Sequence, residues 1–167
     1  MKVKLWATLS ANGNYAQSSA ENPPKKEALD DFAAHVREAG NFIVGRRTFE
    51  FFRAGGGAGF SGIDIVVVSK GVTEIPGVKV AKSPQEALDY LRDKGHATAL
   101  VSGGADLHNA FLGAGLADEL IFNVAPVLEG KGLNLLADTE RYRFEAVELV
   151  DCKPLGGGVV QLRYAVA

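Results

Sequence analysis

The sequence predicts a three-layer α/β sandwich, in which helices cover both faces of a mostly parallel sheet that ends in an antiparallel hairpin. Strand-like and helix-like segments alternate through most of the chain. The run at 63–68 is almost continuously apolar and β-branched, which is typical of a strand covered on both faces. Strand-like segments at 144–150 and 159–166 flank three consecutive glycines near the C-terminus, which predicts the hairpin.

The individual elements follow from apolar spacing and from turn residues. Alternating or continuous apolar residues predict strands at 2–9, 42–44, 63–68, 78–81, 97–101 and 120–124. An apolar stripe that starts at Leu29 predicts a helix that opens at Pro23–Pro24 and ends at Gly40. A second stripe, over 107–114, predicts a helix after Gly103–Gly104. Ser83 as N-cap, followed by Pro84 and Glu86, starts a further helix, which ends at Gly95.

Composition bounds the class of protein. The 167 residues suit one domain, spanning 1–167, and 47% of them are hydrophobic, enough to bury a core. With 18 basic and 20 acidic residues the net charge is -2, which argues against nucleic acid as a partner. No apolar run reaches the roughly 18 residues of a membrane span, and Met1–Leu9 lacks the features of a signal peptide. We expect a cytoplasmic protein with no membrane partner.

Cysteine and histidine usage argues against a metal site. Cys152 is the single cysteine, and its neighbours predict a small buried residue near a strand end rather than a nucleophile. His35, His96 and His108 are far apart in the sequence, and none forms the close pair that transition metals use. We therefore expect no metal.

Three segments that follow predicted strands are candidates for phosphate binding. Gly45 precedes Arg46 and Arg47 at the start of a short helix, and a helix N-terminus with two arginines suits an anion. Ser69–Gly71 forms a polar turn, and Gly103–Gly104 lets a ligand approach the backbone closely. Taken singly, each also fits an ordinary turn. Ligands of α/β sheets bind at the carboxyl ends of strands, so together the segments indicate one site.

A fourth glycine motif has a different interpretation. Gly57, Gly59 and Gly62 match the spacing of a dinucleotide-binding fingerprint. That fingerprint requires its glycines between a strand and a helix, whereas these precede the predicted strand at 63–68. We interpret 54–62 as a glycine-rich loop.

The order of these segments resembles a known family. The NADPH-binding segments of dihydrofolate reductase resemble Ile43–Glu50, Val67–Lys70 and Ser102–Leu107. The stretch Ser102–Leu136 resembles still more closely the reductase domain of bifunctional riboflavin biosynthesis proteins, and the resemblance covers nearly the whole chain. It implies a dihydrofolate-reductase-like fold, NADPH as the cofactor and, from the riboflavin-type enzymes, a homodimer.

The resemblance also implies which residues contact NADPH. Arg46 would bind the 2′-phosphate, Arg47 and Thr48 would meet the pyrophosphate, and Gly103–Gly104 would form the glycine pair of the family, often joined by a cis peptide bond. Other residues would lie beside these groups, at the nicotinamide or in the loop over the active site: Ala7, Thr8, Gly13, Asn14, Gly45, Ser69, Lys70, Ala105, Asp106 and Leu107.

The residues expected to bind the substrate differ from those of both dihydrofolate reductases and riboflavin-type reductases. Dihydrofolate reductases carry a carboxylate four residues before a helix phenylalanine, and that position is Ala28 here. The riboflavin-type enzymes carry a glutamate before the glycine pair and a lysine after the first strand, where this chain has Ser102 and Asn14. The catalytic candidates that remain are Asp31, interpreted first as a solvated acid, and Asn123.

The sequence thus favours an NADPH-dependent reductase that passes hydride to a small C=N or C=O substrate. One candidate reaction is the riboflavin-pathway reduction of 5-amino-6-(5-phosphoribosylamino)uracil. The alternatives are a non-catalytic NADPH-binding sensor and a dihydrofolate reductase. The missing side chains predict weak or no turnover of dihydrofolate, and at best slow turnover of the aminouracil.

Overall fold

Helices and strands alternate along the chain in the computed structural model, which describes residues 1–16, 21–54, 60–130, 132–133, 142 and 144–167. The strands are β1 (Lys2–Leu9), β2 (Asn41–Gly45), β3 (Asp64–Val68), β4 (Lys79–Ala81), β5 (Thr98–Gly103), β6 (Glu119–Val124), β7 (Val147–Gly156) and β8 (Val159–Val166). The helices are α1 (Lys26–Ala39), α2 (Arg46–Ala54), α3 (Pro84–Asp93) and α4 (Ala105–Gly113).

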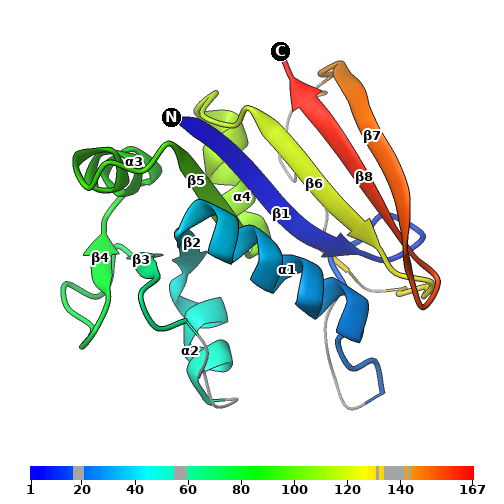
Figure 1. The fold of residues 1–167 in the computed structure, drawn as a ribbon, viewed down its shortest axis with the longest axis horizontal. Coiled ribbons are helices and arrows are strands. Elements are labelled where there is room, and N and C mark those ends of the chain that lie inside the picture. Colours follow the sequence, from blue (N-terminus) through cyan, green and yellow to red (C-terminus); the bar gives the residue numbers. More distant parts are fainter. Residues whose placement is uncertain (17–20, 55–59, 131, 134–141, 143) are drawn as a thin grey trace.

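The strands form one sheet in the order β4-β3-β2-β5-β1-β6-β8-β7. Strands β1 to β6 pair in parallel, and β8 is antiparallel to both β6 and β7. The C-terminal hairpin therefore forms one side of the sheet (Figure 1). The carboxyl ends of the parallel strands lie along one edge, where α2 also lies, and both termini lie toward the opposite edge (Figure 1).

Helices cover both faces of the sheet. Helices α1 and α2 contribute Val36 and Phe49 to the hydrophobic cluster on one face. Helices α3 and α4 contribute Leu91 and Phe111 to the cluster on the other face. Strand β2 contributes to both clusters, because successive side chains of a strand point to opposite faces. The predicted three-layer α/β fold is confirmed.

Two helix boundaries follow the predicted local signals. The Ser83 hydroxyl accepts a hydrogen bond from the Glu86 backbone N–H at 3.2 Å, which caps the start of α3. Gly40 ends α1 with φ 72°, a left-handed conformation that glycine adopts without steric cost. Within the described residues, no helix combines the length and apolarity that crossing a membrane requires.

The first strand of the C-terminal hairpin differs from its prediction. Strand β7 covers Val147–Gly156 rather than 144–150. Most of its residues are exposed, so the strand has no buried face to produce an alternating pattern, and its extent is set by pairing with β8. Cys152 lies within β7 and is exposed, so its predicted buried position near a strand end is wrong.

The dinucleotide-fingerprint alternative does not fit the fold. Gly62, with φ 78°, leads into strand β3 and not into a helix. Gly57 and Gly59, with most of the predicted glycine-rich loop, lie outside the described residues.

Candidate functional site

The three segments predicted to bind phosphate meet at the carboxyl edge of the sheet. Strands β2, β3 and β5 are neighbours, with Gly45 paired to Val68 and Val44 paired to Gly103. A β-carbon built on Gly45 would lie 3.6 Å from the Gly103 carbonyl oxygen. The segments that leave these three strands therefore start from adjacent positions.

The first of these segments is the start of α2. Arg46, Arg47 and Thr48 occupy its first turn directly after β2, and all three are exposed. Arg46 Nε donates to Glu50 Oε1 at 2.9 Å. The Arg46 guanidinium also lies beside the turn after β3, because a β-carbon on Gly71 would be 3.8 Å from its Nη1. Two arginines at a helix N-terminus favour a bound anion.

The second segment, the turn after β3, contains Ser69 and Lys70. Ser69 is partly buried, and its backbone N–H donates to the Ala81 carbonyl at 2.9 Å. Lys70 is exposed. The turn thus holds a hydroxyl and an ammonium group next to the Gly71 position that Arg46 approaches.

The third segment is the glycine pair. Gly103 and Gly104 are joined by a cis peptide bond, as the resemblance implies. Gly104 is the N-cap of α4, and no side-chain hydrogen bond caps that helix. A β-carbon on Gly104 would lie 3.5 Å from Thr48 Oγ1, so a single methyl group would occupy the space between the first turns of α2 and α4.

The other predicted cofactor residues differ in exposure. Ala105 and Leu107 are buried, so only their backbone groups are available to a ligand, whereas Asp106 is exposed. Ala7 is buried and Thr8 is partly buried near the carboxyl end of β1. These residues therefore line the same edge of the sheet but offer different groups.

Gly13 and Asn14 lie in the turn after β1. Gly13 is exposed and has φ 86°. The Asn14 carbonyl accepts from the Ser10 N–H at 2.7 Å, and its side-chain amide donates to the Glu129 carbonyl at 2.9 Å. The turn is thus bound to the segment that follows β6.

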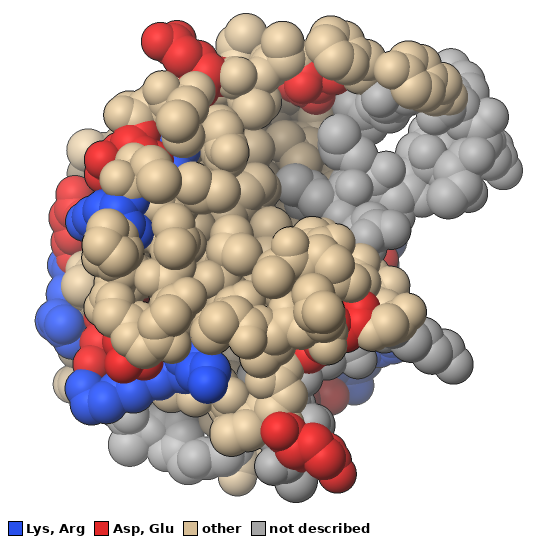
Figure 2. All heavy atoms as spheres, turned by 90° about the vertical axis from the view of Figure 1, so that its right-hand side faces the viewer, with Lys and Arg blue, Asp and Glu red and all other residues tan. Residues whose placement is uncertain are grey.

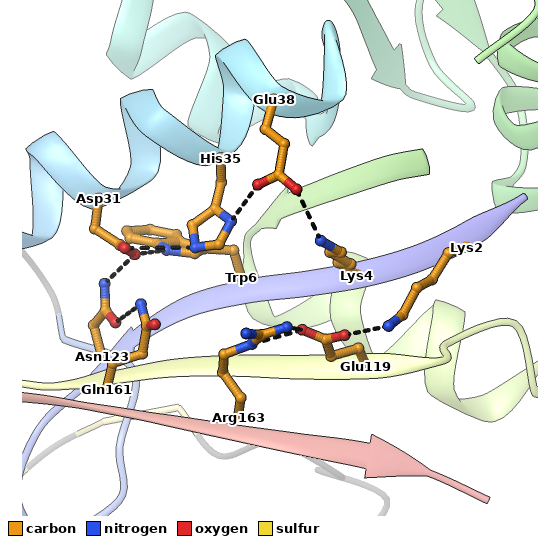
Figure 3. A network of polar contacts seen from close by, with 10 residues as sticks. All are labelled: Lys2, Lys4, Trp6, Asp31, His35, Glu38, Glu119, Asn123, Gln161 and Arg163. Atoms are coloured by element: carbon orange, nitrogen blue, oxygen red, sulfur yellow. Dashed lines mark hydrogen bonds and ion pairs between the residues drawn. The ribbon is translucent and has the colours of Figure 1, made fainter. Parts of the chain in front are cut away.

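Asp31 belongs to a polar network between α1 and the sheet, so its interpretation as a solvated acid is wrong (Figure 3). Its side chain is 13% exposed. Asp31 Oδ2 accepts from Trp6 Nε1 at 2.8 Å and from Asn123 Nδ2 at 2.9 Å. His35 Nε2 lies 3.4 Å from Asp31 Oδ1, and Gln161 Nε2 donates to Asn123 Oδ1 at 3.0 Å. The two catalytic candidates, from α1 and β6, are therefore hydrogen-bonded to each other.

The network fixes the charge of Asp31. Burial alone would raise its pKa, but four hydrogen-bonding neighbours hold that pKa well below its ordinary range: His35, Trp6, Asn123 and Gln161. The carboxylate is thus ionised at neutral pH and has no proton to donate. Asn123 is fully buried. Its side-chain amide donates to Asp31 and accepts from Gln161, so it orients the Asp31 carboxylate.

Sequence reasoning alone does not assign Trp6, His35 or Gln161 to this network. The four-residue spacing of Asp31 and His35 is a signal for the pair, because such residues are neighbours on a helix surface. Trp6 and Gln161 carry no such signal, because their places depend on the order of β1, β6 and β8. Within the described residues, no group of three or more His, Cys, Asp or Glu side chains is placed to hold a metal ion.

Comparison with solved structures places the fold among known proteins. A protein from Shewanella sp. PV-4 whose name refers to riboflavin biosynthesis superposes with a TM-score of 0.79 at 19% identity, covering 100% of this chain and 99% of the other. A pyrimidine reductase-like protein from Corynebacterium diphtheriae has a TM-score of 0.77 at 16% identity, with coverage of 99% and 92%. RibD from Acinetobacter baumannii has a TM-score of 0.72 at 20% identity, and this chain spans 58% of its length.

Sequence comparison identifies the family. Among curated protein sequences, none matches this chain. The family model described as the RibD C-terminal domain matches residues 2–161, which is nearly the whole chain and includes all three strand-end segments. The chain therefore belongs to the RibD C-terminal domain family.

Proposed function

We propose that this protein is an NADPH-dependent reductase that passes hydride to a C=N or C=O group of a small substrate. The observation that carries the proposal is the meeting of the Arg46 turn, the Ser69–Gly71 turn and Gly103–Gly104 at one edge of the sheet. Family membership supports a reductase. A structural relative from Thermotoga maritima, with a TM-score of 0.69 at 15% identity, is named as a diaminohydroxyphosphoribosylaminopyrimidine deaminase/5-amino-6-(5-phosphoribosylamino)uracil reductase. This chain spans 56% of its length.

The residues at this edge fit NADPH. Arg46 would hold the 2′-phosphate, with Ser69 and Lys70 nearby. Arg47, Thr48 and the backbone of Gly104 would hold the pyrophosphate in the space that a methyl group on Gly104 would fill. NADPH supplies the hydride when it is bound there.

The substrate also needs a proton, and we propose that the Asp31–His35 pair delivers it. Hydride transfer to a C=N or C=O carbon leaves a nitrogen or oxygen that takes up a proton. The ionised Asp31 has no proton of its own, and the neighbouring His35 imidazole would supply one to it. His35 is 15% exposed at its side chain, so it can reload from water. Asp31 would orient His35 and stabilise its charged form.

The residues that would bind the substrate lack polar anchors of both the aminouracil reductases and the dihydrofolate reductases. Ala28 is buried and brings no carboxylate to the place that folate reduction requires. Ser102, in place of the riboflavin-type glutamate, uses its hydroxyl to donate to the Ile43 carbonyl at 3.2 Å. Each lost polar anchor is worth about 1–3 kcal/mol, so the aminouracil is expected to react slowly.

Oxidation of NADPH by the purified protein tests the function. We expect measurable but slow oxidation with 5-amino-6-(5-phosphoribosylamino)uracil, and weak or no oxidation with dihydrofolate. NADPH binding with no turnover of any C=N or C=O compound tested would instead favour the sensor. Efficient dihydrofolate reduction, with kcat/KM above about 10⁵ M⁻¹s⁻¹, would show that Asp31 replaces the missing carboxylate.

We also propose that the protein forms a homodimer through β7. This strand is at the edge of the sheet, and Val147, Leu149 and Val150 are 41%, 55% and 54% exposed. Uncharged residues fill much of the face that β7 and β8 present, and most of the charged residues lie toward its margins (Figure 2). Exposed apolar patches of this kind mark association surfaces.

Light scattering after size exclusion tests the dimer. The wild-type protein is expected at twice the mass of one chain, and Leu149→Lys is expected to shift it to one chain, because a charge would be buried in the interface. Leu29→Lys is the matched control, since Leu29 is 51% exposed on α1. A monomeric wild type at micromolar concentration would contradict the proposal.

A further inference from the structure

A partly buried tyrosine and a buried histidine link the loop after β1 to the helix that follows the glycine pair. The Tyr15 hydroxyl lies 2.7 Å from His108 Nδ1, and the two rings have centroids 5.7 Å apart. His108 is 1% exposed, and its Nε2 lies 3.1 Å from the Val101 carbonyl oxygen. A carbonyl only accepts, so Nε2 carries the proton, and Nδ1 of the neutral ring accepts from the Tyr15 hydroxyl.

The electrostatics keep the pair in this state. Burial lowers the pKa of His108 to about 4, against a smaller raising effect of the Val101 carbonyl. Burial also raises the pKa of Tyr15 above its usual value. At neutral pH, His108 is therefore an uncharged acceptor and Tyr15 a protonated donor.

On the Tyr15 side, the contact reaches two loops that are hydrogen-bonded to each other. The segment after β1 and the segment after β6 are joined by hydrogen bonds from Ala11 N–H to the Val127 carbonyl at 2.8 Å and from Tyr15 N–H to the Leu133 carbonyl at 2.9 Å. Asn12 Nδ2 also donates to the Glu129 carbonyl at 2.8 Å. Residues 10–16 and 125–133 thus behave as one unit, which we call the loop pair; residue 131 lies outside the described residues.

On the other side, the pair reaches the proposed cofactor segment. His108 is in the first turn of α4, and its N–H donates to the Gly104 carbonyl at 3.0 Å. A β-carbon on Gly103 would lie 3.8 Å from His108 Cε1. The tyrosine hydroxyl is therefore attached, through one imidazole ring, to the glycine turn.

We propose that Tyr15 and His108 are positioning residues, which hold the loop pair at a fixed distance from the glycine turn that would bind the cofactor. This inference rests on the proposed function for its catalytic consequence. Its structural half, the anchoring of the loop pair, does not.

Hydrogen exchange in the protein without ligand tests the anchoring. Tyr15→Phe removes one hydroxyl, so the amides of Ser10, Ala11, Gly13 and Tyr15 should exchange about 3- to 10-fold faster, as expected for one lost hydrogen bond, while β5 amides stay unchanged. Tyr164→Phe, in β8, is the matched control and should leave the loop pair unchanged. Unchanged exchange in the loop pair of Tyr15→Phe, or an equal rise throughout the protein, would overturn the proposal.

Two histidine variants and the kinetics complete the test. His108→Gln keeps a donor and an acceptor, so the loop-pair amides should exchange at rates closer to wild type than they do in His108→Leu. Equal exchange rates in the two variants would overturn the proposal. With an active enzyme, Tyr15→Phe should raise KM for NADPH about 3- to 10-fold and change kcat less. If the wild-type protein shows no reductase activity but Tyr15→Phe still exchanges faster in the loop pair, the anchoring is supported and the proposed function is refuted.

Discussion

Replacing Asp31 with alanine is expected to lower the free energy of unfolding by about 3 kcal/mol at pH 7. Asp31 accepts charge-assisted hydrogen bonds from Trp6 and Asn123, each typically worth about 1.5–3 kcal/mol, and the substitution leaves both donors without this acceptor. Urea denaturation measures the change. Asp30→Ala is the matched control, because Asp30 is the adjacent residue but is exposed and paired with Lys26 on the surface; it should change stability little.

The same substitution should show a defined pH dependence. The pKa of Asp31 is lower in the folded protein than in the unfolded chain, so its stabilisation is complete above the unfolded value, about 3.9. It is lost progressively as the pH falls below that value toward the folded pKa. The stability gap between wild type and Asp31→Ala should therefore be constant from pH 7 to 5 and narrow at lower pH. A gap that widens on acidification would contradict the ionised state of Asp31.

A second substitution, Asp31→Asn, should separate the effect of Asp31 on catalysis from its effect on stability. Asp31→Asn keeps the shape of the side chain but removes the charge that would stabilise protonated His35. We expect kcat to fall by about 100-fold, the lower end of the usual effect of general acid–base groups. NADPH affinity should remain near wild type, since Asp31 belongs to none of the three segments predicted to bind phosphate. An unchanged kcat would remove Asp31 and His35 from the proposed proton delivery.

Replacing Arg46 with alanine is expected to weaken NADPH binding by about 10- to 100-fold and NADH binding little. A charge-assisted hydrogen bond to the 2′-phosphate, worth about 1.5–3 kcal/mol, is lost only for NADPH. Isothermal titration of both nucleotides measures the ratio. Arg92→Ala is the matched control, because Arg92 is also an exposed helical arginine with a partner on its own helix, Asp89. Equal affinity of the wild type for NADPH and NADH would contradict the assigned role of Arg46.

Local signals were sufficient to bring the three segments predicted to bind phosphate to one place. The glycine pair, the double arginine and the Ser69–Lys70 turn each follow an apolar strand in the sequence, and parallel strands bring their carboxyl ends to one edge. The start of α3 was predictable because Ser83 and Glu86 interact within one turn. Such features depend on residues close together in the chain, so the amino-acid pattern records them.

The sequence by itself therefore determined the fold class, most of the elements and the edge at which the segments predicted to bind phosphate meet. Tertiary structure decided the environment of Asp31, because helical spacing gives the direction of a side chain but not that Trp6 and Asn123 lie on the neighbouring strands. It also decided the pairing of Tyr15 with His108, which are 93 residues apart. The extent of β7 and the exposure of Cys152 were decided in the same way, since a strand without a buried face is defined only by the hydrogen bonds of its partner.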